Sequence, residues 1–208
     1  MWISRNSARL SARKPCKNQI QPTAAVSANW NYGNGRMGEP ETALIQLEVV
    51  PATADEEPVL ANLLELYAHD FSEFFDLKIG VDGTFGYEPL PLYWSESDRF
   101  PFLVRANGDL AGFVLVQQGS QVSGAGEIWD VAEFFVLRGY RRHGVGSRVA
   151  HEVWRMFTGR WEVRVAEKNL AAWAFWRHAV TEFTGVRAES TLTEAAGKRW
   201  HVFSFFSN

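Results

Sequence analysis

The sequence predicts an α/β protein built around one mixed sheet. Segments rich in Val, Ile and Phe alternate with segments in which apolar residues recur every three or four positions. Asn107-Gly108-Asp109 separates two apolar runs and is typical of a hairpin turn. The stretch 145–157 has a helical period and lies between two other apolar runs, which indicates a crossover. Hairpins and crossovers together predict a mostly antiparallel sheet flanked by helices.

The first half of the predicted domain holds one strand, one helix and one long loop. The strand is expected over residues 43–50, where Pro51 ends it. Thr53 and Glu56 fit a capping box, and the apolar spacing behind them predicts a helix over about residues 55–75. Residues 77–97 contain three glycines, two prolines and several aromatic residues, so they are predicted to form a functional loop.

The second half predicts alternating strands and helices. In chain order these are strands over residues 100–106, 110–118 and 127–137, a helix over 145–157, a strand over 161–166, a helix over 170–180, and a closing hairpin of 186–192 and 199–206. Gly159 is expected to stop the first of these helices, and Asn169 is expected to cap the second.

Composition limits the class of protein. The chain has 208 residues, of which 46% are apolar, enough for one core and therefore one domain over residues 41–208. It has no run of eighteen apolar residues, so no membrane span is expected. The single cysteine, Cys16, excludes an internal disulfide framework and a cysteine-rich zinc site. We therefore expect a cytoplasmic protein without a metal.

Charge is segregated along the chain. Residues 1–38 carry six basic groups and no acid, residues 39–98 carry fourteen acids and one base, and residues 99–208 are mildly basic. The acidic segment opposes phosphate contacts, so a nucleic-acid partner is not expected. Residues 1–40 are interpreted as a disordered basic leader, or as a segment included because the start codon is mis-assigned and Met37 is the true initiator. An organellar transit peptide is the less favoured interpretation.

The most informative motif follows the strand predicted over 127–137. Arg141-x-x-Gly144-x-Gly146 connects this strand directly to a helix. Unpaired amides at a helix N-terminus attract anions, and glycines let a diphosphate approach the main chain. A Walker loop is excluded because no Gly-Lys-[Ser/Thr] occurs, and a dinucleotide fold is excluded because the motif comes late in the chain. An ordinary glycine-rich turn with solvated arginines is the alternative.

These residues resemble the GNAT superfamily of acyl-CoA-dependent N-acetyltransferases. Phe134, Phe135 and Val136 match the end of that family's strand, and the Arg-x-x-Gly-x-Gly motif matches its loop. Further along, Asn169, Ala172, Phe175 and Trp176 match its second helix. The resemblance covers nearly all of the chain after the leader. It implies a sheet that splays between its fourth and fifth strands.

The resemblance also implies where acetyl-CoA, the co-substrate, would bind. The pantetheine arm would bond to the main chain of Phe135, Val136 and Leu137, with Asn169 near the opening of the sheet. The pyrophosphate would lie on backbone amides, with basic side chains at the rim, formed by Arg141, Arg142, His143, Gly144, Val145, Gly146 and Ser147. The implied reaction is direct attack of a primary amine, from a small molecule or a peptide, on the thioester in a ternary complex.

Direct attack needs a base, because an alkylammonium is mostly protonated at neutral pH. Glu133 is the preferred candidate and Asp130 the second, both on the strand before the loop. Three positions apart, they point to opposite faces of a regular strand unless a bulge intervenes. The alternative is that one of them forms a structural salt bridge with an arginine.

The acid and the acceptor contacts are less defined. Trp176 stands where many members of the family carry a tyrosine that protonates the leaving thiolate, so Tyr140, His178 or water would have to serve. Tyr87, Tyr93 and Trp94 in the long loop are the candidates for contact with the acceptor amine.

Two other classes of function compete with the enzyme. The missing tyrosine favours a non-catalytic acyl-CoA-binding sensor or regulatory module, whereas the two carboxylates favour catalysis. A structural α/β protein without a coenzyme site is the third interpretation. The acceptor's identity is not predicted, and the oligomeric state is left open between monomer and homodimer.

Overall fold

The structure of the protein, a computed structural model, describes residues 45–208. The leader predicted at residues 1–40 and the first two residues of the predicted 43–50 strand lie outside this part. The described residues form a seven-stranded sheet in the order β1-β2-β3-β4-β5-β7-β6. The strands are β1 (Leu47–Pro51), β2 (Arg99–Ala106), β3 (Asp109–Gln118), β4 (Trp129–Val136), β5 (Gly159–Ala166), β6 (Ser190–Ala195) and β7 (Lys198–Ser207).

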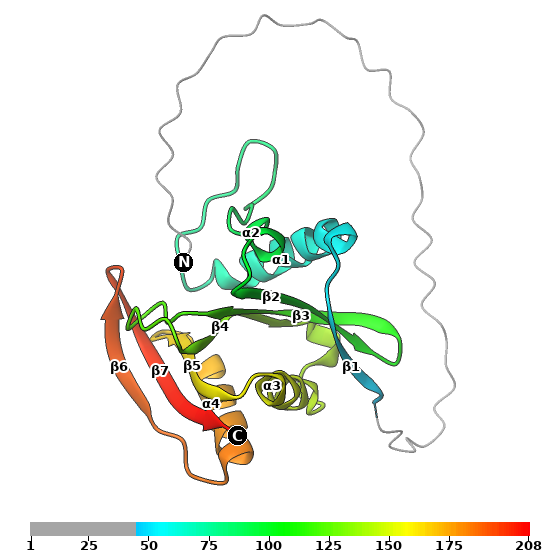
Figure 1. Ribbon diagram of the computed structural model, residues 1–208. Coiled ribbons are helices and arrows are strands. Elements are labelled where there is room, and N and C mark those ends of the chain that lie inside the picture. Colours follow the sequence, from blue (N-terminus) through cyan, green and yellow to red (C-terminus); the bar gives the residue numbers. More distant parts are fainter. Residues whose placement is uncertain (1–44) are drawn as a thin grey trace, which may run out of the picture. The chain divides into compact units, whose positions relative to one another are not determined.

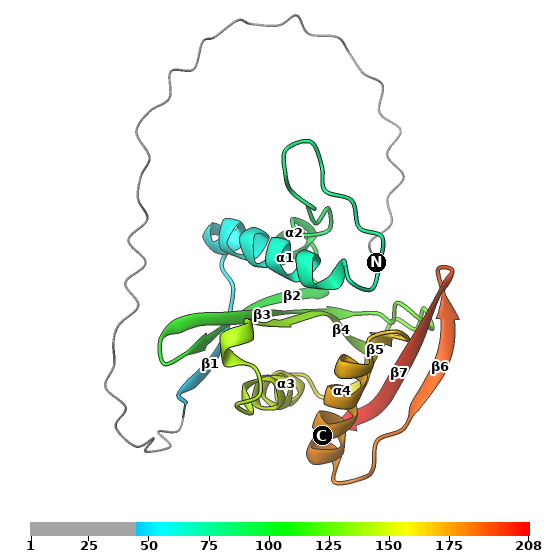
Figure 2. The ribbon, with the colours of Figure 1, turned by 180° about the vertical axis from the view of Figure 1, so that it is seen from behind.

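The helices cover both faces of the sheet. They are α1 (Glu57–Phe71), which follows a short 3-10 turn at Ala54–Glu56, α2 (Leu92–Ser95), α3 (Val145–Met156) and α4 (Leu170–Thr184). α1 and α2 lie on one face, and α3 and α4 lie on the other (Figure 1). The view from behind shows the same two layers (Figure 2). The predicted α/β class, with a sheet flanked by helices, is confirmed.

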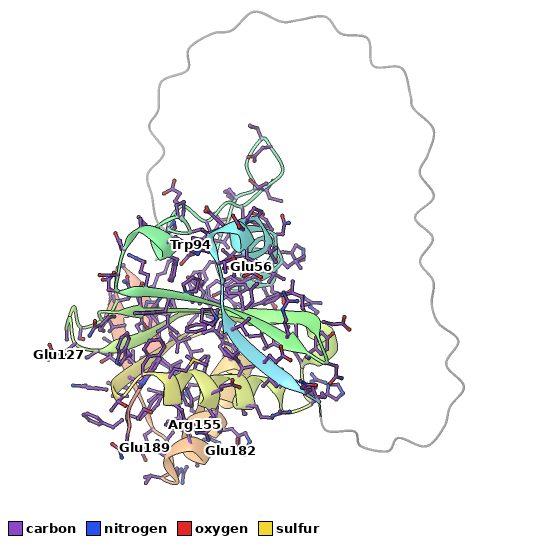
Figure 3. The ribbon with its side chains drawn as sticks, turned by 45° about the vertical axis from the view of Figure 1, so that its right-hand side comes forward. Glu56, Trp94, Glu127, Arg155, Glu182 and Glu189 are labelled. Carbon is purple, nitrogen blue, oxygen red and sulfur yellow. The ribbon has the colours of Figure 1, made fainter. Side chains whose placement is uncertain are left out.

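The sheet divides the core into two parts. On the α3/α4 face, Trp154 and Trp161 are fully buried among valines and phenylalanines of the sheet. On the α1 face, Leu60 packs against Phe113 and Leu115 of β3. Figure 3 shows the same division, with Glu56 and Trp94 on the α1 side and Arg155 and Glu182 on the other.

Several element boundaries differ from the predicted ones. β1 includes Pro51, which is tolerated because β1 is an edge strand and proline cannot donate to a ladder. α1 ends at Phe71, earlier than expected, and the loop predicted over 77–97 contains the short α2. α4 continues to Thr184, where Gly185 ends it with a φ of 71°. The last hairpin therefore starts at Ser190 rather than at 186.

One pair of strands opens in the middle of the sheet. β4 and β5 are the parallel pair, and they are in register only at Trp129–Trp161 and Asp130–Glu162. Beyond these pairs β4 continues to Val136 without pairing to β5. The splay predicted between the fourth and fifth strands is therefore present.

A bulge lies in β4 just beyond the last paired residues. Leu115 of β3 pairs with Glu133 and the next residue, Val116, pairs with Val131, so Ala132 is left without a partner. An extra residue in one strand shifts the alternation of side chains. Asp130 and Glu133 are consequently brought to the same face of β4, the face that α1 covers.

Candidate active site

The loop between β4 and α3 presents a row of main-chain amides. Arg142 and Gly144 have positive φ angles of 66° and 74°, and Gly144 is the residue that precedes α3. Within residues 45–208, the amides of residues 142–147 donate to no other group of the chain, whereas Arg148 N bonds to the Gly144 carbonyl. Such a row at a helix N-terminus is suited to an anion.

The two glycines of the motif are glycines for different structural reasons. A Cβ at Gly144 would meet nothing within 4 Å, so glycine is favoured there by its positive φ. A Cβ at Gly146 would lie 2.9 Å from the ring of Phe175 in α4. A side chain at position 146 would therefore displace the Phe175 ring, and this contact joins the two motifs.

The arginine of the motif is already engaged. Arg141 Nε donates to the carbonyl of Val136 over 2.7 Å, and its Nη2 lies 2.7 Å from Asp70 Oδ2 in α1. Arg138 bonds to the other oxygen of Asp70. These two arginines lower the pKa of Asp70 although burial acts in the opposite direction. Arg141 thus anchors the loop to α1, and the exposed Arg142 and His143 are left to supply charge at the rim.

The main chain of β4 near the loop is only partly free. The amide of Leu137 donates to the carbonyl of Ala111 in β3, and the carbonyl of Val136 accepts from Arg141. Phe135 pairs with Phe113 of β3, and its side chain is buried on the α1 face. Of the three residues expected to meet the pantetheine arm, Leu137 thus has its amide already paired.

Asn169 has the capping role that its sequence position indicates. Its side-chain oxygen accepts a hydrogen bond of 2.9 Å from the amide of Ala172, in the first turn of α4. The capping bond fixes where α4 begins, next to the end of β5 at Ala166. A role toward a coenzyme would have to use its remaining amide group.

Glu133 lies between two tyrosines. Its Oε2 accepts a hydrogen bond of 2.5 Å from Tyr67 of α1, and its Oε1 accepts one of 3.2 Å from Tyr87 in the loop before α2. Burial raises the pKa of both phenols well above the ordinary value, and the carboxylate of Glu133 adds to the effect. Both tyrosines therefore stay protonated donors that fix the orientation of the carboxylate.

Asp130 has a different environment. It is 1% exposed, and it forms a buried ion pair with Arg164 of β5. Its Oδ2 also accepts from Gln117 of β3 over 3.3 Å. Burial raises its pKa, and Arg164 opposes this rise. This is the structural salt bridge named as the alternative for one of the two carboxylates.

Of the three loop aromatics expected at the acceptor site, Tyr87 and Tyr93 lie near Glu133, and the fold separates Trp94 from them. Tyr87 reaches Glu133. Tyr93 is 3% exposed inside the core cluster on the α1 face. Trp94 donates its indole N–H to the carbonyl of Ala52 over 3.1 Å, which fixes α2 to the end of β1. Their positions favour packing roles for Tyr93 and Trp94.

The structure adds two residues that the sequence did not single out. Tyr67 fits the apolar stripe of α1, so its spacing indicates only a packing role. Arg164 lies within the strand predicted over 161–166, but its guanidinium crosses to β4, where it also donates to the carbonyl of the bulged Ala132 over 3.3 Å. No local pattern indicates either contact.

The candidates for the proton donor lie apart from one another. Trp176 is buried, and its ring packs against Phe134 and Trp154 with centroids 4.9 and 6.0 Å away. His178 is exposed, and its Nε2 lies 3.3 Å from Glu182 on α4. Tyr140 packs against the core on the α3/α4 face. None of the three contacts Glu133, whereas Tyr67 and Tyr87 do.

Residues 45–208 contain no cluster of three or more His, Cys, Asp or Glu residues able to bind a metal ion. None of their helices has the length and apolar character that crossing a bilayer requires.

A family model described as the acetyltransferase (GNAT) family matches residues 60–179. An acetyltransferase from Thermus thermophilus is 15% identical, with a TM-score of 0.57, over 78% of this chain and 97% of that one. No curated protein matches the chain at a significant level.

Two similar structures were solved with coenzyme A. PaiA N-acetyltransferase from Thermoplasma acidophilum is 9% identical, with a TM-score of 0.53, over 78% of this chain and 99% of that one. An aminoglycoside acetyltransferase is 11% identical, with a TM-score of 0.56, over 77% of this chain and 95% of that one. At these identities the likeness is one of fold.

Proposed function

Because the chain belongs to the acetyltransferase (GNAT) family, we propose that it transfers an acetyl group from acetyl-CoA to a primary amine. The observation that carries this proposal is the row of amides at residues 142–147, which no other group of residues 45–208 occupies. The coenzyme A bound by two proteins of the same fold supports acetyl-CoA as the donor.

The chain's own residues fit the parts of acetyl-CoA. The amides of residues 142–147 would hold the pyrophosphate, and Arg142 and His143 would add positive charge at the rim. The thioester arm would enter between β4 and β5, where the two strands are no longer hydrogen-bonded. Along that edge of β4 the amide of Val136 would supply the main-chain contact, because the Val136 carbonyl accepts from Arg141 and Phe135 pairs with Phe113 of β3.

Glu133 is the proposed base. The amine must lose a proton for its nitrogen lone pair to attack the thioester carbonyl carbon, and the carboxylate accepts that proton. Tyr67 and Tyr87 hold one oxygen each, so the carboxylate is fixed before the amine arrives. The carbon–sulfur bond then breaks. Because a thiol of this kind has a pKa of about 8.5, the thiolate can leave without a dedicated acid.

We propose that Asp130 has a structural role and does not take the proton. Its ion pair with Arg164 fixes the two strands where they begin to separate, and this leaves Glu133 as the carboxylate that faces the tyrosines. The acceptor is proposed to be a small-molecule or peptidyl amine.

The test has two parts. Calorimetric titration with acetyl-CoA and with CoA should show one saturable site on the full chain. A free-thiol assay with acetyl-CoA and a panel of primary amines should then show thiol release that depends on the amine. Binding without release for any amine would support an acyl-CoA sensor instead, and absence of binding would support a structural protein.

A further inference from the structure

A row of aromatic rings connects the proposed base to the far side of the sheet opening. Tyr67 stacks on Phe71 with ring centroids 5.1 Å apart, and Phe71 lies 5.1 Å from Phe75, just after α1. Phe75 in turn lies 5.8 Å from Trp200 of β7. We name these four residues the aromatic arc. All four residues are partly buried rather than enclosed in the core.

The aromatic arc bridges the splayed strands. Tyr67 contacts Glu133 of β4 at one end. At the other end the guanidinium of Arg164, on β5, lies 5.9 Å from the Trp200 ring. Because β4 and β5 are unpaired beyond Asp130 and Glu162, the arc lies beside the opening on the α1 face.

The two ends of the aromatic arc differ in charge. The Tyr67 end holds the Glu133 carboxylate. At the other end Lys198 Nζ lies 4.1 Å from the centroid of Phe75. Arg164 also lies over Trp200, but its charge is paired with that of Asp130. A cation is therefore attracted to one end and repelled at the other.

From this arrangement we propose that the aromatic arc selects the acceptor: a primary amine that carries an aromatic or other apolar group and no second cation. The inference rests on the proposed function. The ammonium group is bound at Glu133, and its apolar group packs along the rings toward Trp200. A long diamine would bring its second ammonium toward Lys198. A polyhydroxylated amine would lose hydrogen bonds to water against the rings.

The experiment compares three amines in the free-thiol assay with the full chain. The kcat/KM for 2-phenylethylamine should be at least about tenfold higher than that for ethylamine, which lacks the ring. It should exceed the kcat/KM for 1,5-diaminopentane, which adds a charge, by at least about the same factor. Trp200→Ala and Phe75→Ala should lower the value for 2-phenylethylamine about tenfold and that for ethylamine less than about threefold. Lys198→Glu should raise the value for the diamine relative to that for 2-phenylethylamine.

Phe206→Ala is the matched control. Phe206 is on the same strand as Trp200, an even number of positions away, and is 66% exposed, but it is outside the aromatic arc. This variant should change none of the three values. Calorimetric binding of acetyl-CoA should stay unchanged in Trp200→Ala and Phe75→Ala, which shows that both variants are folded and that the loss concerns the acceptor.

The outcomes separate this inference from the proposed function. The aromatic arc is overturned as a selector if the three amines have equal kcat/KM values. It is also overturned if Trp200→Ala and Phe75→Ala lower the values for ethylamine and 2-phenylethylamine equally. Acetyl transfer stands in both cases. Acetyl-CoA binding without thiol release for any amine would overturn both.

Discussion

The hydroxyl of Tyr67 in α1 lies 2.5 Å from Oε2 of Glu133 in β4, 66 positions further along the chain. The bulge at Ala132 makes this contact possible, because without it Asp130 and Glu133 would point to opposite faces. With the bulge, both carboxylates lie on the α1 face, and their partners distinguish them. Glu133 is held by neutral hydroxyls, and Asp130 is held by the cation of Arg164.

The first prediction concerns this division of roles. Glu133→Gln should lower kcat at least about a hundredfold, the usual contribution of a general base. Asp130→Asn should lower kcat less, because Asp130 is buried against Arg164 and Gln117 rather than facing the tyrosines. Steady-state kinetics with saturating acetyl-CoA measures both. If Asp130→Asn has the larger effect, the base is Asp130.

The second prediction concerns alkaline pH. Burial and the Glu133 carboxylate raise the pKa of Tyr67 well above its ordinary value, so the folded state binds this proton more tightly than the unfolded state. The resulting stability is complete below about pH 10, where the unfolded phenol titrates, and is lost as the pH rises toward the folded pKa. Each such tyrosine should cost about 1.4 kcal/mol per pH unit above pH 10.

Urea unfolding between pH 8 and pH 11 measures this slope. Tyr67→Phe should be less stable than the wild type at pH 8 but lose less stability above pH 10. Trp94→Phe is the control, since it removes a side-chain hydrogen bond to Ala52 without removing a titratable group. An unchanged alkaline slope in Tyr67→Phe would contradict the tight binding of the phenol proton.

How far the sequence predicts the fold depends on how local each signal is. Asn107 and Gly108 have positive φ angles of 52° and 84°, as a tight hairpin requires, and their residue types predict the turn. Asn169 caps α4 at the expected position. Gly185 carries an equally local signal for the end of α4, but residues 186–189 behind it do not belong to the strand predicted over 186–192.

The site is less predictable because its contacts are long-range. The motif at 141–146 identified the loop, but the partner of Arg141, Asp70, lies 71 positions earlier. Tyr67 has the spacing of a core residue, and Arg164 has that of an ordinary strand residue. The partners of both polar groups lie on β4, far from them in the sequence, and no pattern within one segment encodes such a contact.

The third prediction concerns the buried ion pair. Arg164→Met should lower the free energy of unfolding by roughly 3–5 kcal/mol, because Asp130 would remain buried without its cation. The double variant with Asp130→Asn should lose less than Arg164→Met alone, because the orphaned charge is gone. Urea unfolding at pH 7 measures both.

Arg199→Met is the matched control for this pair. Arg199 bonds to Glu167 over 3.0 Å, but the two side chains are 55% and 35% exposed. Its loss should cost less than about 1 kcal/mol. Equal effects of the two arginine variants would show that burial does not make the Arg164–Asp130 pair special.

The fourth prediction concerns the amide row. Gly144→Glu should weaken acetyl-CoA binding at least about tenfold, because it places a negative charge where residues 142–147 would hold the pyrophosphate. Gly124→Glu is the matched control: Gly124 has the same φ of 74° and open space around its Cα, so the backbone strain and the added charge are equal. Calorimetric titration compares the two variants, with thermal unfolding as the check on the fold. If the amides at the start of α3 bind the pyrophosphate, only Gly144→Glu should lose affinity for acetyl-CoA. Equal affinities in both variants would show that the coenzyme does not bind at this loop.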